Sequence, residues 1–76
     1  MDKQQVALDV LAQLSGVARD QIQPTMELVA DLGIDSPKAL QLLVELEDRL
    51  QIEISDEAAA RMDTVGDIFN FLATAG

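Results

Sequence analysis

The chain has 76 residues, 49% of them hydrophobic, and contains neither cysteine nor histidine. Disulfide bonds and the common zinc ligand sets are therefore excluded, and a chain of this length buries one small core. Fourteen Asp and Glu residues oppose five Lys and Arg residues, which gives a formal net charge of −9. Because this charge repels phosphate backbones and anionic lipids, we expect neither nucleic acid nor a membrane as a partner, and we favour basic protein surfaces.

The sequence shows no repeat, no low-complexity tract and no linker. No segment is long and apolar enough to span a bilayer, and the N-terminal residues carry no cleavage signature. We therefore expect a cytoplasmic monomer that forms a single domain over residues 1–76 and does not insert into membranes.

The first helix is expected over residues 3–15, because Asp2 suits the N-cap position and Gly16 suits the position just past the C-terminus. One arc of its helical wheel is apolar, as in a helix that packs on a core. The members of this arc are Val6, Ala7, Val10, Leu11 and Leu14.

A long connection over residues 16–35 follows, with Pro24 and Gly33 as helix breakers. Its apolar residues predict that it packs down over the bundle. A single helical turn is expected near residues 27–32, ended by Gly33.

The second long helix is expected to begin with Ser36 as N-cap and Pro37 at the first helical position, and to continue to about Gln51. Its core stripe is Ala39, Leu42, Leu43, Leu46 and Leu50. Leu40 and Val44 fall on the opposite side of the wheel, so burial of the core stripe leaves them exposed.

Two further helices are expected in the last third of the chain. Ser55 caps a short one, and residues 63–75 predict a final helix with Thr64 as cap. The sequence therefore predicts an all-α fold, a small four-helix bundle of three longer helices and one short helix with a long first loop.

The exposed pair on the second helix suggests a docking surface, a small apolar patch with a charged rim. Isolated surface leucines are also common and need no such explanation. The docking candidates are Pro37, Lys38, Leu40, Gln41, Val44, Glu45 and Asp48.

Ser36 lacks the adjacent base that a serine nucleophile needs, since the chain has no histidine. A self-contained serine hydrolase is therefore not expected. A helix N-terminus is instead a favourable seat for an anionic group, because its backbone N–H groups and dipole attract negative charge.

Two other readings of the same segment are weaker. Ser36 and Pro37 match a proline-directed phosphorylation site, a short pattern that arises by chance. Asp31 and Asp35 match no EF-hand spacing and are interpreted as a solvated acidic patch, so no metal site is predicted.

The segment ELVADLGIDSPKALQLLVELEDRLQIEISDE resembles the acyl carrier proteins, above all in DLGIDS and the acidic, leucine-rich helix that follows. The resemblance implies that Ser36 bears a covalent 4′-phosphopantetheine arm, attached by a phosphopantetheinyl transferase that recognises Asp35. Acyl intermediates are then held on the arm as thioesters and presented to fatty-acid, polyketide or specialised lipid enzymes with basic docking patches. The chain itself would not be an enzyme.

The resemblance also implies that the acyl chain shelters between the helices. The expected lining is Leu28, Leu46, Ile54, Met62 and Phe69, which ordinary core packing explains equally well. The alternative function is an unmodified helical adaptor for protein–protein interaction, in which Ser36 is only a helix cap.

The chain departs from the family pattern directly after Ser36. Family members most often have leucine where Pro37 stands, and commonly have acids at the positions of Lys38 and Gln41. These departures favour a carrier with a dedicated pathway, such as polyketide or specialised lipid synthesis, over one that serves the housekeeping fatty-acid enzymes.

Overall fold

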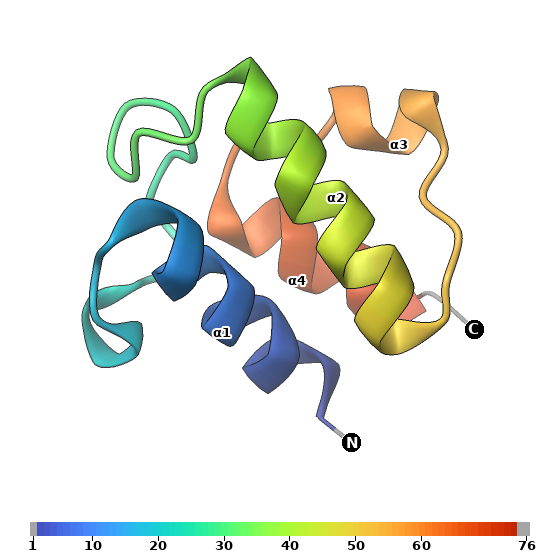
Figure 1. The fold of residues 1–76 in the computed structure, drawn as a ribbon, viewed down its shortest axis with the longest axis horizontal. Helices are drawn as coiled ribbons and strands as arrows, with labels where there is room; N and C mark the ends of the chain where they lie inside the picture. Colours follow the sequence, from blue (N-terminus) through green and yellow to red (C-terminus); the bar gives the residue numbers. More distant parts are fainter. Residues whose placement is uncertain (1, 75–76) are drawn as a thin grey trace.

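Residues 2–74 are described by the computed structural model, and they form four α-helices and one 3₁₀ turn (Figure 1). The elements are α1 (Lys3–Ser15), η1 (Arg19–Gln21), α2 (Ser36–Leu50), α3 (Asp56–Ala60) and α4 (Val65–Thr74). The predicted all-α fold, with three longer helices, one short helix and a long first loop, is confirmed. Ala75, where the last helix was expected to end, lies outside the described residues. None of the helices within residues 2–74 has the length and apolar character needed to cross a membrane.

The predicted ends of α1 are confirmed by their hydrogen bonds. The Asp2 carboxylate accepts a bond from the Gln4 N–H at 3.0 Å, and the Gly16 N–H donates to the Ala12 carbonyl at 2.9 Å. Gly16 has a φ of 76°, a left-handed conformation that costs glycine little. The helix packs against both α2 and α4. The turn η1, which the sequence did not predict, is tied back to α1 by the ion pair between Arg19 and Asp9 at 2.9 Å.

Helix α2 has the two faces that its wheel predicts. Leu42 and Leu46 are 2% and 0% exposed, whereas Leu40 and Val44 are 64% and 55% exposed. The helix ends at Gln51, which has a φ of 55° and donates its backbone N–H to the Glu47 carbonyl. One helix therefore both closes the core and displays apolar surface.

The core draws on α1, the long connection, α2 and α4, whereas the short helix α3 contributes no fully buried residue. Its buried members are Ala7, Val10, Leu11, Ile22, Leu28, Leu32, Ile34, Leu42, Leu46, Val65, Ile68 and Leu72. Four of these belong to the long connection, which confirms that this segment packs over the bundle. Among residues 2–74 no polar or charged residue is buried.

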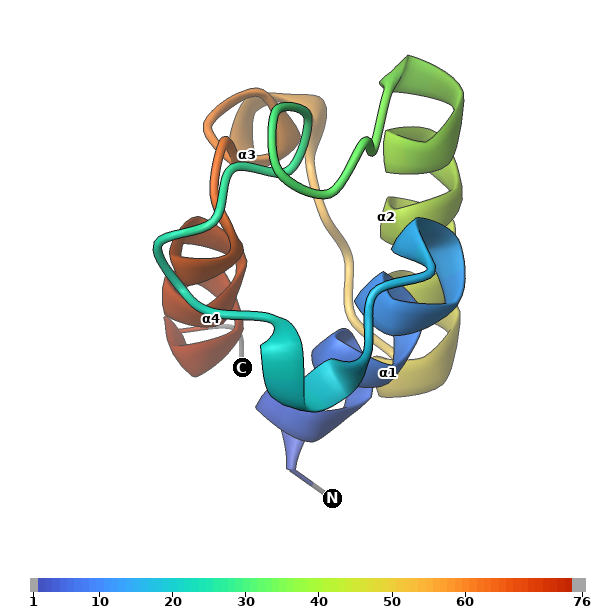
Figure 2. The same ribbon diagram turned by 90° about the vertical axis from the view of Figure 1, so that its left-hand side faces the viewer.

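Backbone hydrogen bonds join the long connection to the start of α4 and to the residues just before it. Leu28 N–H donates to the Asp63 carbonyl at 2.9 Å, Val65 N–H donates to Met26 at 3.0 Å, and Gly66 N–H donates to Pro24 at 2.9 Å. Figure 2 shows this segment running beside α4 on its way to α2. The bonds fix the path by which the chain reaches α2.

The connection then makes the predicted helical turn. Asp31 N–H donates to the Glu27 carbonyl at 3.0 Å, and Gly33 N–H donates to Val29 at 3.0 Å, each bond spanning four residues. Gly33 ends the turn with a φ of 65°. The Ile34 N–H donates to the Leu28 carbonyl at 2.8 Å, which closes the loop two residues before α2 begins.

Helix α4 begins with a reciprocal cap. The Thr64 hydroxyl accepts a bond from the Asp67 N–H at 3.1 Å, as predicted for a Thr64 cap. In return, Asp67 Oδ2 accepts from the N–H groups of Asp63 and Thr64 at 3.0 and 3.1 Å. These bonds favour the ionised carboxylate and hold the pKa of Asp67 below its ordinary value of 3.8.

Asp67→Asn is expected to destabilise the protein at neutral pH and to lose this effect in acid. Because the folded-state pKa of Asp67 is lowered, its bonds add stability above pH 3.8 and lose it as the pH falls through the folded-state pKa. Urea unfolding of wild type and variant at pH 7 and pH 3 checks this. The neighbouring change Asp63→Asn leaves the cap acceptor in place and should not reproduce the pattern; an equal Asp67→Asn deficit at both pH values would contradict the account.

A matched pair of truncations on α2 tests the assignment of its faces. Leu46→Ala opens a cavity at a fully buried site and is expected to cost about 2–5 kcal/mol of unfolding free energy. Val44→Ala, two residues away at an exposed site, should stay within about 0.5 kcal/mol of wild type. Urea denaturation measures both, and a larger loss at Val44 would mean that the faces are assigned the wrong way round.

Candidate functional site

Ser36 is the first residue of α2, and the residue that caps the helix is Asp35. The Asp35 carbonyl accepts the first helical bond from the Ala39 N–H at 2.7 Å, and its carboxylate accepts from the Lys38 N–H at 3.3 Å. The prediction that Ser36 is the N-cap and Pro37 the first helical residue is therefore wrong by one position. Aspartate caps as well as serine does, and Pro37 is tolerated as the second helical residue because first-turn N–H groups have no intrahelical partner.

This shift frees the hydroxyl that the sequence assigned to capping. Ser36 is exposed, and within the part of the chain that the structure describes its side chain has no hydrogen-bond partner. Pro37 has no N–H and the N–H of Lys38 is engaged by Asp35, so the expected set of free first-turn donors is not present. The helix dipole and the nearby Lys38 ammonium remain as the features that favour an anionic group at Ser36.

The acids that precede Ser36 have structural partners. Asp31 Oδ2 accepts a bond from the Glu27 N–H at 2.7 Å and so steadies the turn, while Asp35 caps α2. Within residues 2–74 no group of three or more His, Cys, Asp or Glu residues is placed to hold a metal ion.

The predicted docking residues lie along one exposed face of α2. Four of them, Leu40, Gln41, Val44 and Glu45, also line a groove of about 420 Å³ between α1 and α2. The other wall of the groove is Val10, Gln13 and Leu14 of α1, which the sequence did not assign to docking. Pro37, Lys38 and Asp48 lie outside the lining, on the exposed part of the same helix.

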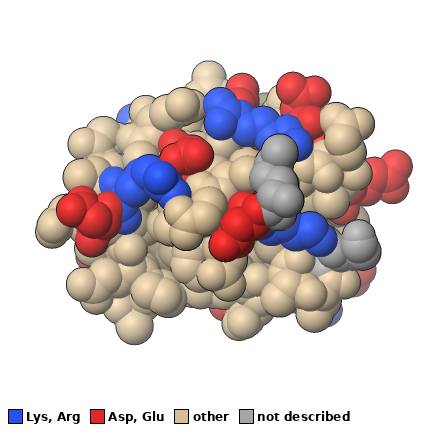
Figure 3. Space-filling model, turned by 90° about the horizontal axis from the view of Figure 1, so that it is seen from below, with Lys and Arg blue, Asp and Glu red and all other residues tan. Residues whose placement is uncertain are grey.

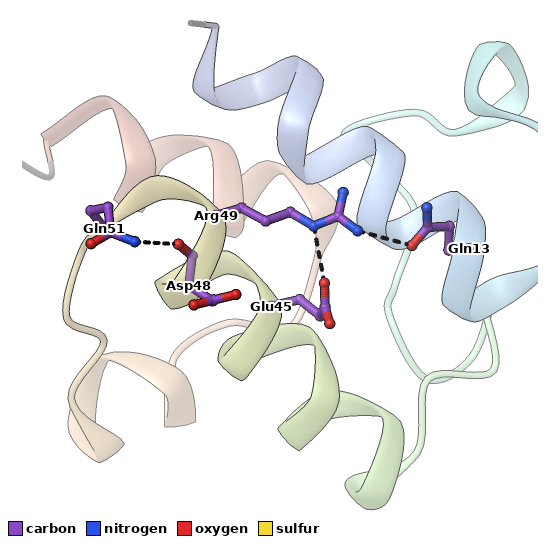
Figure 4. A network of polar contacts seen from close by, with 5 residues as sticks. All are labelled: Gln13, Glu45, Asp48, Arg49 and Gln51. Carbon is purple, nitrogen blue, oxygen red and sulfur yellow. Dashed lines mark hydrogen bonds and ion pairs between the residues drawn. The ribbon is translucent and has the colours of Figure 1, made fainter.

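A small polar network joins the two walls of this groove (Figure 4). Arg49 Nε donates to Glu45 Oε2 at 3.0 Å, and Arg49 Nη2 donates to Gln13 Oε1 of α1 at 3.3 Å. The charge of Glu45 is therefore offset by Arg49, and α2 is tethered to α1 beside the apolar groove. Gln51 closes the end of α2 by donating from Nε2 to the Asp48 carbonyl at 2.6 Å.

The five residues expected to shelter an acyl chain are only partly gathered at one place. Leu28 and Met62 line a hollow of about 300 Å³ together with Val29, Ile34 and Ala39, among others. Leu46 is fully buried, and Ile54 and Phe69 are half-buried against the same core. Ala39 stands about one helical turn after Ser36, so the hollow lies beside the beginning of α2.

The surface charge is mixed where the net charge alone suggests uniform acidity. Figure 3 shows Lys and Arg side chains standing among Asp and Glu side chains on the face seen from below. A partner that approaches this face meets both signs at close range, where salt screens individual charges least.

The structure defines a class of protein, a small helical bundle with an exposed serine at the first residue of a long helix. A family model described as "Phosphopantetheine attachment site" matches residues 5–72. The acyl carrier protein of Syntrophobacter fumaroxidans is 41% identical over 66 residues, which are 87% of this chain and 82% of that protein. The solved acyl carrier protein of Enterococcus faecalis superposes with a TM-score of 0.78 at 29% identity, over 100% of both chains.

A relative of another kind is part of a large synthase. One subunit of the polyunsaturated fatty acid synthase of a Thraustochytrium species is 41% identical over 66 residues, which are 86% of this chain but 2% of that protein.

The family model and the acyl carrier relatives together show that the chain belongs to the acyl carrier proteins, the family of phosphopantetheine attachment domains. Its role is that of a carrier, and these comparisons favour this role over the alternative of an unmodified adaptor.

Asp35→Ala is expected to cost about 1 kcal/mol of unfolding free energy, because it removes the carboxylate that caps α2. Asp35→Ser, which keeps a capping oxygen, should recover most of this loss. Ser36→Ala is the matched control and should change the stability little, because its hydroxyl caps nothing. Urea denaturation of the three variants measures these differences, and a larger loss for Ser36→Ala than for Asp35→Ala would restore Ser36 as the cap.

Proposed function

We propose that Ser36 carries the 4′-phosphopantetheine arm and that the acyl group is held on this arm as a thioester. The observation that carries the proposal is the position of Ser36, exposed at the first residue of α2 with its hydroxyl unengaged within residues 2–74. Nothing in the surrounding fold has to move before a transferase reaches this hydroxyl. The absence of cysteine fits this role, because the arm brings the thiol that the thioester needs.

A separate phosphopantetheinyl transferase is the first partner in this proposal. Ser36 has no base beside it, since the chain contains no histidine, so the enzyme that attaches the arm must take the proton from the hydroxyl. Asp35 is the proposed contact of this enzyme. Its carboxylate is exposed and accepts a hydrogen bond from the Lys38 N–H, which holds a negative charge in a fixed position beside Ser36.

The enzymes that load and use the acyl group are the second class of partner. We place their docking site on the exposed face of α2, where Leu40 and Val44 supply apolar surface close to Ser36. The charged and polar rim of this site comprises Lys38, Gln41, Glu45 and Asp48, and Pro37 lies beside it next to Ser36. Because Pro37, Lys38 and Gln41 depart from the family pattern, we favour a dedicated pathway, such as polyketide or specialised lipid synthesis, over the housekeeping fatty-acid enzymes.

The acyl chain is proposed to enter by the hollow that Leu28 and Met62 line beside the Ser36 end of α2. The hollow is bordered by Val29, which is 68% exposed and offers apolar surface to a chain leaving the arm. Leu46, Ile54 and Phe69 lie deeper or on other parts of the same core, so a long acyl chain reaches them only if these side chains repack.

Co-expression with a promiscuous phosphopantetheinyl transferase is expected to add the mass of one arm to the protein, read by intact-protein mass spectrometry. Ser36→Ala should abolish the addition. Ser55→Ala is the matched control, because Ser55 is also exposed at the start of a helix, and it should be loaded as wild type is. A wild-type chain that stays unmodified under these conditions, or a Ser36→Ala chain that gains the arm, would refute the proposal.

A further inference from the structure

The exposed face of α2 carries a charge of opposite sign at each end. Lys38 lies in the first turn and Asp48 near the end of the helix, and both are exposed. The apolar side chains of Leu40 and Val44 stand between them, 64% and 55% exposed. Within the described range, residues 2–74, neither Lys38 nor Asp48 has an ion pair.

The fold gives no reason for this order of charges. The N-terminus of a helix is the positive end of its dipole, so stability favours acids in the first turn and bases in the last. Lys38 and Asp48 stand the other way round, and the acid that the rule favours at the start of α2 is the capping residue Asp35. Arg49, in the last turn, does follow the rule, and it is engaged by Glu45. Lys38 also favours an anionic group at Ser36, but Asp48 has no ion pair within residues 2–74. Charges set against the helix dipole at both ends of one exposed face indicate a partner that meets both.

The surface between the two charges is mainly apolar, and its polar members other than Glu45 are the uncharged Gln13 and Gln41. The groove between α1 and α2 is lined by Leu40 and Val44 together with α1 residues, and the carboxylate of Glu45 on its wall is neutralised by Arg49. The bond from Arg49 to Gln13 holds that wall against α1. Such a groove accepts an uncharged apolar side chain without stranding a charge.

From this arrangement we propose that the enzyme surface which receives the carrier presents three features in a fixed order. A carboxylate faces Lys38, an apolar side chain enters the groove between α1 and α2, and a cation faces Asp48. The ten residues from Lys38 to Asp48 set the two charged contacts about 15 Å apart. The inference rests on the proposed attachment of the arm at Ser36, because this places the partner's carboxylate at the opening that receives the arm. The partner surface that we propose is therefore mixed in charge, in place of the basic docking patch that the net charge of the chain suggests.

Two synthetic helical peptides test the order of charges on the unmodified protein. The first has glutamate, leucine, leucine and lysine at positions 1, 5, 8 and 12, which puts all four on one face over about 16 Å. The second differs only by lysine in place of the glutamate. Each is titrated into ¹⁵N-labelled protein at about 0.15 M salt, where charges more than about 8 Å apart are screened. The measurements are the dissociation constant and the backbone amides whose resonances shift.

Wild type is expected to bind the mixed peptide about threefold more tightly than the dilysine peptide, because the mixed peptide forms one more exposed ion pair and avoids one repulsion. The shifts should include Gln13, Leu40 and Val44. Lys38→Glu should invert the preference, while Arg61→Glu, a comparable charge reversal at the end of α3 and outside the groove, should leave it intact. Tighter binding of the dilysine peptide to wild type, no binding of the mixed peptide, or shifts away from the groove would each overturn the inference.

These outcomes are independent of the arm. Mass spectrometry of the loaded protein decides whether Ser36 carries the arm, and the peptides are titrated into the unloaded form. A chain that is loaded at Ser36 but prefers the dilysine peptide would keep the proposed function and lose only the mixed docking face.

Discussion

The position of Ser36 depends on the hydrogen bonds that attach the long connection to the start of α4. Backbone groups of Pro24, Met26 and Leu28 pair with those of Gly66, Val65 and Asp63, so the connection is fixed before the chain turns at Gly33. Buried backbone groups need partners, and here the connection and the α3–α4 junction satisfy one another. The cap of α4 by Thr64 and Asp67 orders the same junction. A residue at the beginning of α2 is thus held in place by contacts at the beginning of α4.

Most of the fold could be predicted from the sequence because its signals are local. Asp2, Ser55 and Thr64 each cap the helix that follows, as their side-chain chemistry predicts. The two faces of α2 follow from the helical repeat alone, which separates Leu46 from Val44. The choice between Asp35 and Ser36 as the cap could not be made in this way. Two adjacent residues of equal capping ability compete there, and the conformation of the preceding turn decides between them.

The part of the site that the sequence did not supply is the part made by two helices together. A wheel of α2 places Leu40 and Val44 on its outer face but says nothing of what stands beside them. The groove with Gln13 and Leu14 exists because α1 packs against α2. The bond from Arg49 to Gln13 spans 36 residues, so no local pattern reports it. The residues proposed to line the acyl site were ambiguous for a different reason, since packed core positions and the walls of an acyl site use the same apolar residue types.

The buried interior of residues 2–74 is assembled from aliphatic side chains alone. An interior held by polar contacts has one arrangement of low energy, because each directional bond is lost when its partner moves. Aliphatic side chains set no such directional condition, although an extra methylene group forced into a packed core costs about 1–3 kcal/mol. The acyl chain proposed to enter this interior would contact aliphatic walls only, so its entry would leave no buried polar group unpaired. The core that keeps the protein folded would therefore also be the surface that the acyl chain contacts, at the cost of repacking its side chains.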